Sequence, residues 1–175
     1  MTAYSSHCDG RIIHDADSHL QEKAGWVESF ASKYVQDNLD PPFLDITKVE
    51  SAQPFLQQAE KRLRGEDPAM TEQLKANLFS DPQKMNMWAA YGASDNVERL
   101  DSLNIAGLKK QLVFPGLVFA SRFARSKDLD VVYGGTDAMN RAMLDFCSAD
   151  PDRLLSVGYL SFKDPAKSLE SAKQA

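Results

Sequence analysis

The 175-residue sequence has little cysteine, no surplus of positive charge and no long apolar segment. Its two cysteines, Cys8 and Cys147, lie far apart and form no C-x-x-C motif, so a disulfide framework is not expected and a reducing, cytoplasmic environment fits. No apolar run approaches the ~20 residues of a membrane-spanning helix. The first ten residues also lack the basic and apolar regions of a signal peptide.

The formal net charge is −5, and the basic residues are scattered along the chain. Nucleic acids and anionic membranes attract proteins through a positive field, so neither is an expected partner. The contents of 43% hydrophobic and 26% charged residues are ordinary for a soluble globular protein. A chain of this length can form one domain with a real core.

Short apolar runs alternate with helical patterns along the chain. Strands are predicted near residues 11–17, 111–115 and 154–160. Such alternation predicts an α/β fold with a parallel sheet and outer helices. Residues 43–90 are interpreted as a mostly helical, variable insertion after the first strand. Helices are predicted from residue 26 to the prolines at 41–42, around 52–65, at 95–103, at 136–148 and from 165 onwards.

Several boundaries rest on capping and turn signals. Asp95 and Glu98 have the spacing of a capping box. Asn104 is a residue type that tolerates the left-handed conformation at a helix end. The Gly-Gly-Thr sequence at 134–136 is predicted to open the helix with the clearest apolar stripe. Two segments are predicted to be turns: residues 65–70 and 80–85.

The first predicted strand ends in a titratable cluster, RIIHDADSHLQE, from Arg11 to Glu22. Residues two apart on a strand share a face, so Asp17 and His19 would project together. A carboxylate oxygen and an imidazole nitrogen held ~2.0–2.2 Å from a common point suit a divalent metal such as Zn²⁺. In parallel α/β folds, ligand sites lie at the carboxyl ends of strands. On spacing alone, a polar turn in which Asp17 or Ser18 caps the next segment is still favoured over a metal site.

The segment DADSHLQE after a short apolar strand resembles the opening of the amidohydrolase-related family of metal-dependent hydrolases and decarboxylases. Two later stretches are similar to the family in the same order: NVERLDSLNIAGLKKQLVFPGL and DAMNRAMLDFCSADPDRLLSVGYLSFKDP. The resemblance covers about residues 11–22 and 94–175. It implies the N-terminal half of a (β/α)8 TIM barrel with a metal at the C-terminal face. Asn104 stands where the family often has Gly.

The resemblance also implies a ligand set. Asp17 and His19 match the family's first-strand pair, usually His-x-His or Glu-x-His, and are expected to bind a divalent metal, with zinc the expected ion. Glu22 is a candidate contact to substrate or metal, with a solvated loop position as its alternative. Phe114 is a candidate substrate contact, with a core position as its alternative. Asp15 is interpreted as a structural carboxylate. No metal role is assigned to His7 or His14, which are interpreted as ordinary residues.

The family's other ligands, typically a His and an Asp, come from the fifth and eighth strands. They and the catalytic residues are expected beyond residue 175. Ala175 falls inside an amphipathic pattern, so residues 1–175 are expected to be a single partial domain. Such a fragment is expected to be inactive alone. Its open strand edges are expected to favour self-association into a homo-oligomer or aggregate.

The predicted function is metal-dependent hydrolysis or nonoxidative decarboxylation of a small-molecule substrate. A metal would activate a bound water or polarise a substrate oxygen. Two alternatives remain open. The first is a noncatalytic α/β unit that assembles with another chain. The second is a metal-free small-molecule-binding domain, which divergence of Asp17 and His19 in space would favour.

Overall fold

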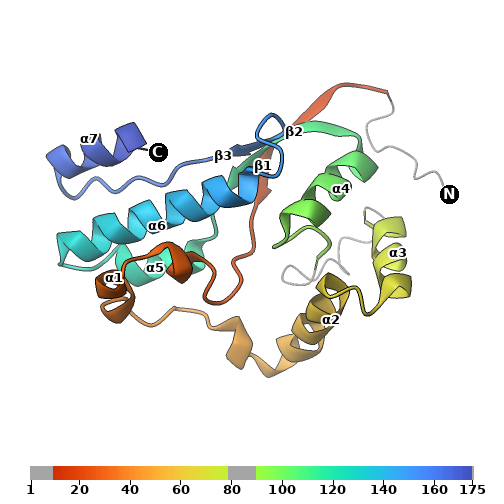
Figure 1. The fold of residues 1–175 in the computed structure, drawn as a ribbon, viewed down its shortest axis with the longest axis horizontal. Coiled ribbons are helices and arrows are strands. Elements are labelled where there is room, and N and C mark those ends of the chain that lie inside the picture. The colour runs from red at the N-terminus through yellow and green to blue at the C-terminus, as the bar shows by residue number, and fades with distance from the viewer. Residues whose placement is uncertain (1–9, 79–89, 175) are drawn as a thin grey trace.

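The computed structural model describes residues 10–78 and 90–174 (Figure 1). The described residues form an α/β fold with one three-stranded parallel sheet and seven α-helices. The strands are β1 (Ile13–His19), β2 (Leu108–Phe114) and β3 (Leu154–Ser156), in the order β1-β2-β3. This confirms the predicted α/β class and the order of three parallel strands. In the part of the chain so described, no helix is long and apolar enough to cross a membrane.

A β-bulge shapes the carboxyl half of β1. Asp15 pairs with Gln111 and Ser18 pairs with Val113, so β1 carries one residue more than β2 between these pairs. Asp15 Oδ1 accepts a hydrogen bond from the backbone N–H of Asp17 at 3.0 Å, and this bond stabilises the bulge. Because of this bulge, the side-chain alternation of β1 changes phase between Asp15 and Ser18.

Helices α4 (Asn96–Ala106) and α6 (Leu129–Cys147) pack on one face of the sheet. One core cluster joins both helices to all three strand regions, and it contains Leu20, Leu103, Val113, Met143, Phe146, Cys147 and Leu154. A second cluster lies where α6 packs against α5 (Leu117–Phe123) and against residues 27–35. These two clusters make α6 the central helix of the fold.

The segment predicted as one helix from residue 26 is divided in two. A 3-10 helix, η1 (Val27–Phe30), precedes α1 (Lys33–Asp37). Ala31 between them is extended, with φ −85° and ψ 148°. Ser32 then starts α1 by accepting a hydrogen bond from the backbone N–H of Val35 at 3.3 Å. Both parts of the predicted helix are helical, but extended Ala31 and the Ser32 cap separate them.

Two other helix boundaries differ from the prediction. Helix α6 begins at Leu129, with Asp128 as its N-cap, and not at residues 134–136. A Cβ on Gly135 would lie 2.4 Å from a ring carbon of Phe123, so this glycine serves close packing inside the helix. Helix α4 ends at Gly107, which has the left-handed φ of 75°, and Asn104 is not the terminator.

The capping box at α4 is only half formed. Asp95 accepts hydrogen bonds from the backbone N–H groups of Val97 and Glu98, as predicted. The Glu98 carboxylate instead pairs with Arg62, at 2.7 Å between Arg62 Nε and Glu98 Oε1. A long-range ion pair therefore replaces the local contact.

The insertion after β1 contains two 3-10 helices and two α-helices: η2 (Ile46–Lys48), η3 (Glu50–Ala52), α2 (Gln53–Leu63) and α3 (Pro68–Ala76). Figure 1 shows α2 and α3 at the opposite end of the molecule from α1 and α5. Ion pairs attach this end to α4, namely Arg62–Glu98 and Lys75–Asp101. The second of these contacts raises the pKa of Lys75 above its ordinary value.

The turn predicted at 65–70 is correct only at its start. Gly65 has the left-handed φ of 73°, but Asp67 caps α3 and Pro68 occupies the first turn of that helix. The turn predicted at 80–85 lies outside the described residues, as do His7 and Cys8. The last helix, α7 (Pro165–Gln174), begins where the sequence predicts it.

Candidate functional site

Asp17 and His19 lie together at the carboxyl end of β1. His19 Nε2 is 3.1 Å from Asp17 Oδ1, and the side chains are 57% and 88% exposed respectively. Asp17 lies within the bulge and His19 follows it; both side chains are exposed, whereas the alternating Ser18 and Leu20 are buried. The side chains therefore meet, as the period-two argument requires, and they do so on an exposed face.

Phe114 lies beside this pair. Its ring stacks on the His19 imidazole, with 5.5 Å between centroids and 27° between planes. The two residues are partners in the parallel ladder, and the Phe114 carbonyl accepts a hydrogen bond from the Leu20 N–H at 3.0 Å. Phe114 is half-buried, so it is neither a core residue nor a fully exposed one. Its contact limits the orientations of the His19 ring.

Arg99 of α4 holds the same end of β1 from the buried face. Its guanidinium donates to Ser18 Oγ, to the His19 carbonyl at 3.0 Å and to the Gly92 carbonyl. Burial lowers the pKa of Arg99, and the negative charge of Asp15 opposes that shift. With the Ala93 carbonyl at 3.3 Å, four acceptors for one buried guanidinium make this a rigid anchor for the backbone that carries Asp17 and His19.

The chemistry of this pair suits a divalent metal, but it supplies two donors only. Zinc sites in proteins use at least three protein ligands. In the residues that the structure describes, no group of three His, Cys, Asp or Glu side chains is placed to hold an ion. Asp15 does not join the pair, because its Oδ2 accepts a hydrogen bond from Gln111 Nε2 at 3.0 Å.

Glu22 follows three residues after His19 but faces a different region. Its Oε2 accepts a hydrogen bond from the Phe119 N–H at 2.8 Å, in the first turn of α5. Its Oε1 is shielded from solvent and has no hydrogen-bond partner among the described residues. Burial raises the pKa of Glu22 to about 7; the Phe119 hydrogen bond opposes this shift and the charge of Glu28 adds to it.

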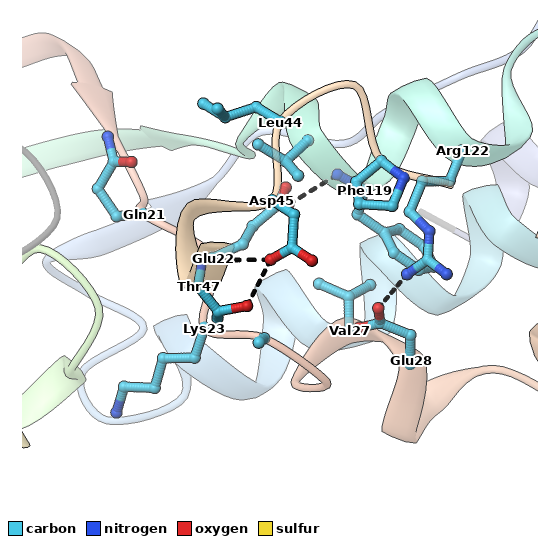
Figure 2. A pocket seen from close by; sticks show the side chains of 13 residues that line it. Gln21, Glu22, Lys23, Val27, Glu28, Leu44, Asp45, Thr47, Phe119 and Arg122 are labelled. Carbon is cyan, nitrogen blue, oxygen red and sulfur yellow. Dashed lines mark hydrogen bonds and ion pairs between the residues drawn. The ribbon is translucent and has the colours of Figure 1, made fainter. Parts of the chain in front are cut away.

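Glu22 forms part of the wall of two neighbouring cavities. The first, of about 290 Å³, lies between the residues after β1, the 42–47 segment and the start of α5 (Figure 2). The second, of about 390 Å³, lies between the same residues after β1 and α2. Residues 21–24 and Thr47 line both. Glu22 is thus a cavity residue, although not one that meets Asp17 or His19.

The other charged residues of the first cavity are not indicated by the sequence pattern. Arg122 and Glu28 form an ion pair in its wall, and Asp45 accepts from Thr47 Oγ1 at 2.6 Å (Figure 2). The Pro-Gly sequence at 115–116 follows the second strand. Gly116 also makes room for Glu22, because a Cβ there would lie 2.7 Å from Glu22 Oε1.

No protein-family model matches this chain, and a search of the curated proteins finds no match either.

Proposed function

We propose that this chain provides the first metal ligands of a metal-dependent hydrolase or nonoxidative decarboxylase built on a (β/α)8 barrel. The observation that carries the proposal is the 3.1 Å contact between Asp17 Oδ1 and His19 Nε2 at the carboxyl end of β1. Parallel α/β enzymes place their ligand sites at this end of the strands. The order of the three parallel strands also agrees with the first part of a barrel.

In this proposal each residue near the pair has a distinct task. Asp17 and His19 hold the ion, with further ligands supplied from outside the described residues. Arg99 fixes the backbone of residues 18 and 19, and Phe114 restricts the His19 ring. A bound zinc ion would supply either an activated water or a polarised substrate oxygen. A cavity of about 310 Å³ beside the pair could take a small substrate; His19 lines it with Asp15 and Arg99, whereas Asp17 does not.

A noncatalytic unit that assembles with another chain is the second candidate. It is favoured by the exposed face of the sheet, where Leu112 is 38% exposed, and by strands β1 and β3 at its two edges. Unpaired edges and apolar surface promote association between chains. Sedimentation of the purified chain separates the candidates: assembly without zinc binding favours the second.

Metal binding by the chain tests the first candidate. Zinc is titrated into the protein while the histidine ring protons are followed by NMR. We expect the His19 signals to shift in the parent chain. They should shift to the same extent in His14→Ala, a control variant at an exposed histidine of the same strand. Asp17→Asn and His19→Ala should each weaken binding about tenfold or more. Unchanged zinc affinity in both variants would reject the assignment.

The reaction class needs a separate experiment on protein that carries the remaining barrel strands. Esters, amides and aromatic acids are incubated with the zinc-loaded protein. Release of carbon dioxide from an aromatic acid identifies decarboxylation, and release of an alcohol or amine identifies hydrolysis. Absence of turnover on all three classes, with zinc bound, would favour the noncatalytic alternative.

A further inference from the structure

The cavity beside α5 contains a carboxyl group without a charged partner. Three carboxylates line this cavity, and the structure pairs two of them. Glu28 is paired with Arg122, and Asp45 with Lys48, at 2.9 Å between Lys48 Nζ and Asp45 Oδ2. Glu22 receives one backbone N–H, and its second oxygen has no donor among the described residues. A buried carboxylate left in this condition is costly unless a donor or a cation is added.

The rest of the wall determines what kind of donor fits. Arg122 is already engaged, because it also donates from Nε to the Asp40 carbonyl at 2.9 Å. An anionic ligand would therefore compete with bonds that exist. The remaining wall also contains Gln21, Thr47 and Lys23, whose ammonium group lies 4.0 Å from Asp95 Oδ2. Apolar side chains supply much of the rest: Ala24, Val27, Pro42, Leu44, Val118 and Phe119. This combination of an unpaired acid and an apolar lining suits a ligand with a positive head and a small apolar body.

We propose that the cavity is a binding site for a small organic ammonium ion, with the ammonium group paired to the Glu22 carboxylate. Each oxygen of an ionised carboxylate can accept more than one hydrogen bond, so Glu22 can accept from an ammonium group while it keeps the hydrogen bond from the Phe119 N–H. The volume of about 290 Å³ is at the lower end of small-molecule sites, which suits a body of one aromatic ring. This site goes beyond the proposed function and requires no metal.

The test is calorimetric titration of the chain with 2-phenylethylamine in the presence of a chelator. Two probes of similar shape serve as comparisons: neutral 2-phenylethanol and anionic 3-phenylpropanoate. We expect the amine to bind at least tenfold more tightly than either at pH 8. Equal binding of the alcohol, or preferred binding of the propanoate, would overturn the proposal.

The pH dependence of amine binding identifies the group. The Glu22 carboxyl has a pKa of about 7, so binding should weaken about tenfold from pH 8 to pH 6 as the carboxylate takes up a proton. In Glu22→Gln, binding at pH 8 should fall by at least tenfold and become independent of pH in this range. That result also excludes the other charged groups that line the two cavities: Lys23, Glu28, Asp45, Glu60, Arg64 and Arg122.

Three further variants keep the test decisive. Glu50→Gln removes an exposed carboxylate outside both cavities and should bind the amine normally. Thr47→Trp narrows both cavities from an exposed position, so it should weaken amine binding even if Glu22→Gln fails to fold. His19→Ala should bind the amine normally whatever it does to zinc. Normal amine binding by Thr47→Trp or Glu22→Gln would reject the site.

Discussion

Replacing Glu22 by glutamine should change how the stability of the protein depends on pH. The pKa of Glu22 is about 7 in the folded chain, against an ordinary value of 4.5. Below 4.5 both folded and unfolded chains hold the proton. Between 4.5 and about 7 the unfolded chain loses the proton and the folded chain keeps it, so stability falls as pH rises. Above about 7 both forms are ionised and the loss is complete.

The structure gives the size of this effect. The difference between about 7 and 4.5 corresponds to about 3 kcal/mol of folding free energy. Glutamine has no such titration, and its carbonyl oxygen can still accept the hydrogen bond from the Phe119 N–H. Its amide group adds donors with no acceptor in the structure, at a cost of about 1 kcal/mol. Glu22→Gln should therefore be about 2 kcal/mol more stable than the parent at pH 8.

Urea unfolding at pH 5 and pH 8, followed by circular dichroism, measures this difference. The parent should lose stability between the two pH values relative to the variant. Glu50→Gln, at an exposed position, should keep the pH dependence of the parent. If Glu22→Gln and the parent lose the same stability between pH 5 and pH 8, burial of the Glu22 charge is not the cause.

Other substitutions test the packing around the site. Gly135→Ala should destabilise the protein by about 2 kcal/mol, because its Cβ would meet the Phe123 ring; unchanged urea midpoints would contradict that contact. Gly107→Ala should cost about 1 kcal/mol by the same assay, because φ there is 75°. Arg99→Lys should cost about 2–4 kcal/mol and weaken zinc binding, because lysine lacks the fork that reaches Ser18 and three carbonyls. Equal stability would show that Arg99 is not an anchor.

The sequence predicts the order of the strands because they have strong local signals. Short apolar runs at 111–115 and from residue 154 indicate the second and third strands, and the structure pairs them in the predicted order. The third strand is shorter than predicted, because β3 ends at Ser156 and not at residue 160. The meeting of Asp17 and His19 also follows from strand periodicity. The bulge at Asp15 could not be predicted, because it depends on a side-chain bond to the backbone of Asp17 and on the register against β2.

Long-range contacts explain what local patterns missed. Helix α5 is seven residues long and its N-cap Gly116 offers no side chain, so its sequence has no start signal. Glu22, distant by 97 residues, supplies the acceptor for its first turn. In the same way, the glycines at 134–135 look like a helix start until the Phe123 ring is placed against them. Neither relation has a signature within one segment of the chain.

The account depends most directly on Asp17 and His19 acting as a ligand pair. Zinc titration of the chain, followed by the ring-proton NMR signals of His19 and His14, examines that pair. The account predicts that the His19 signals move with added zinc, that the His14 signals do not, and that Asp17→Asn suppresses the change at His19. Equal shifts at the two histidines, or an unchanged His19 response in Asp17→Asn, would contradict it.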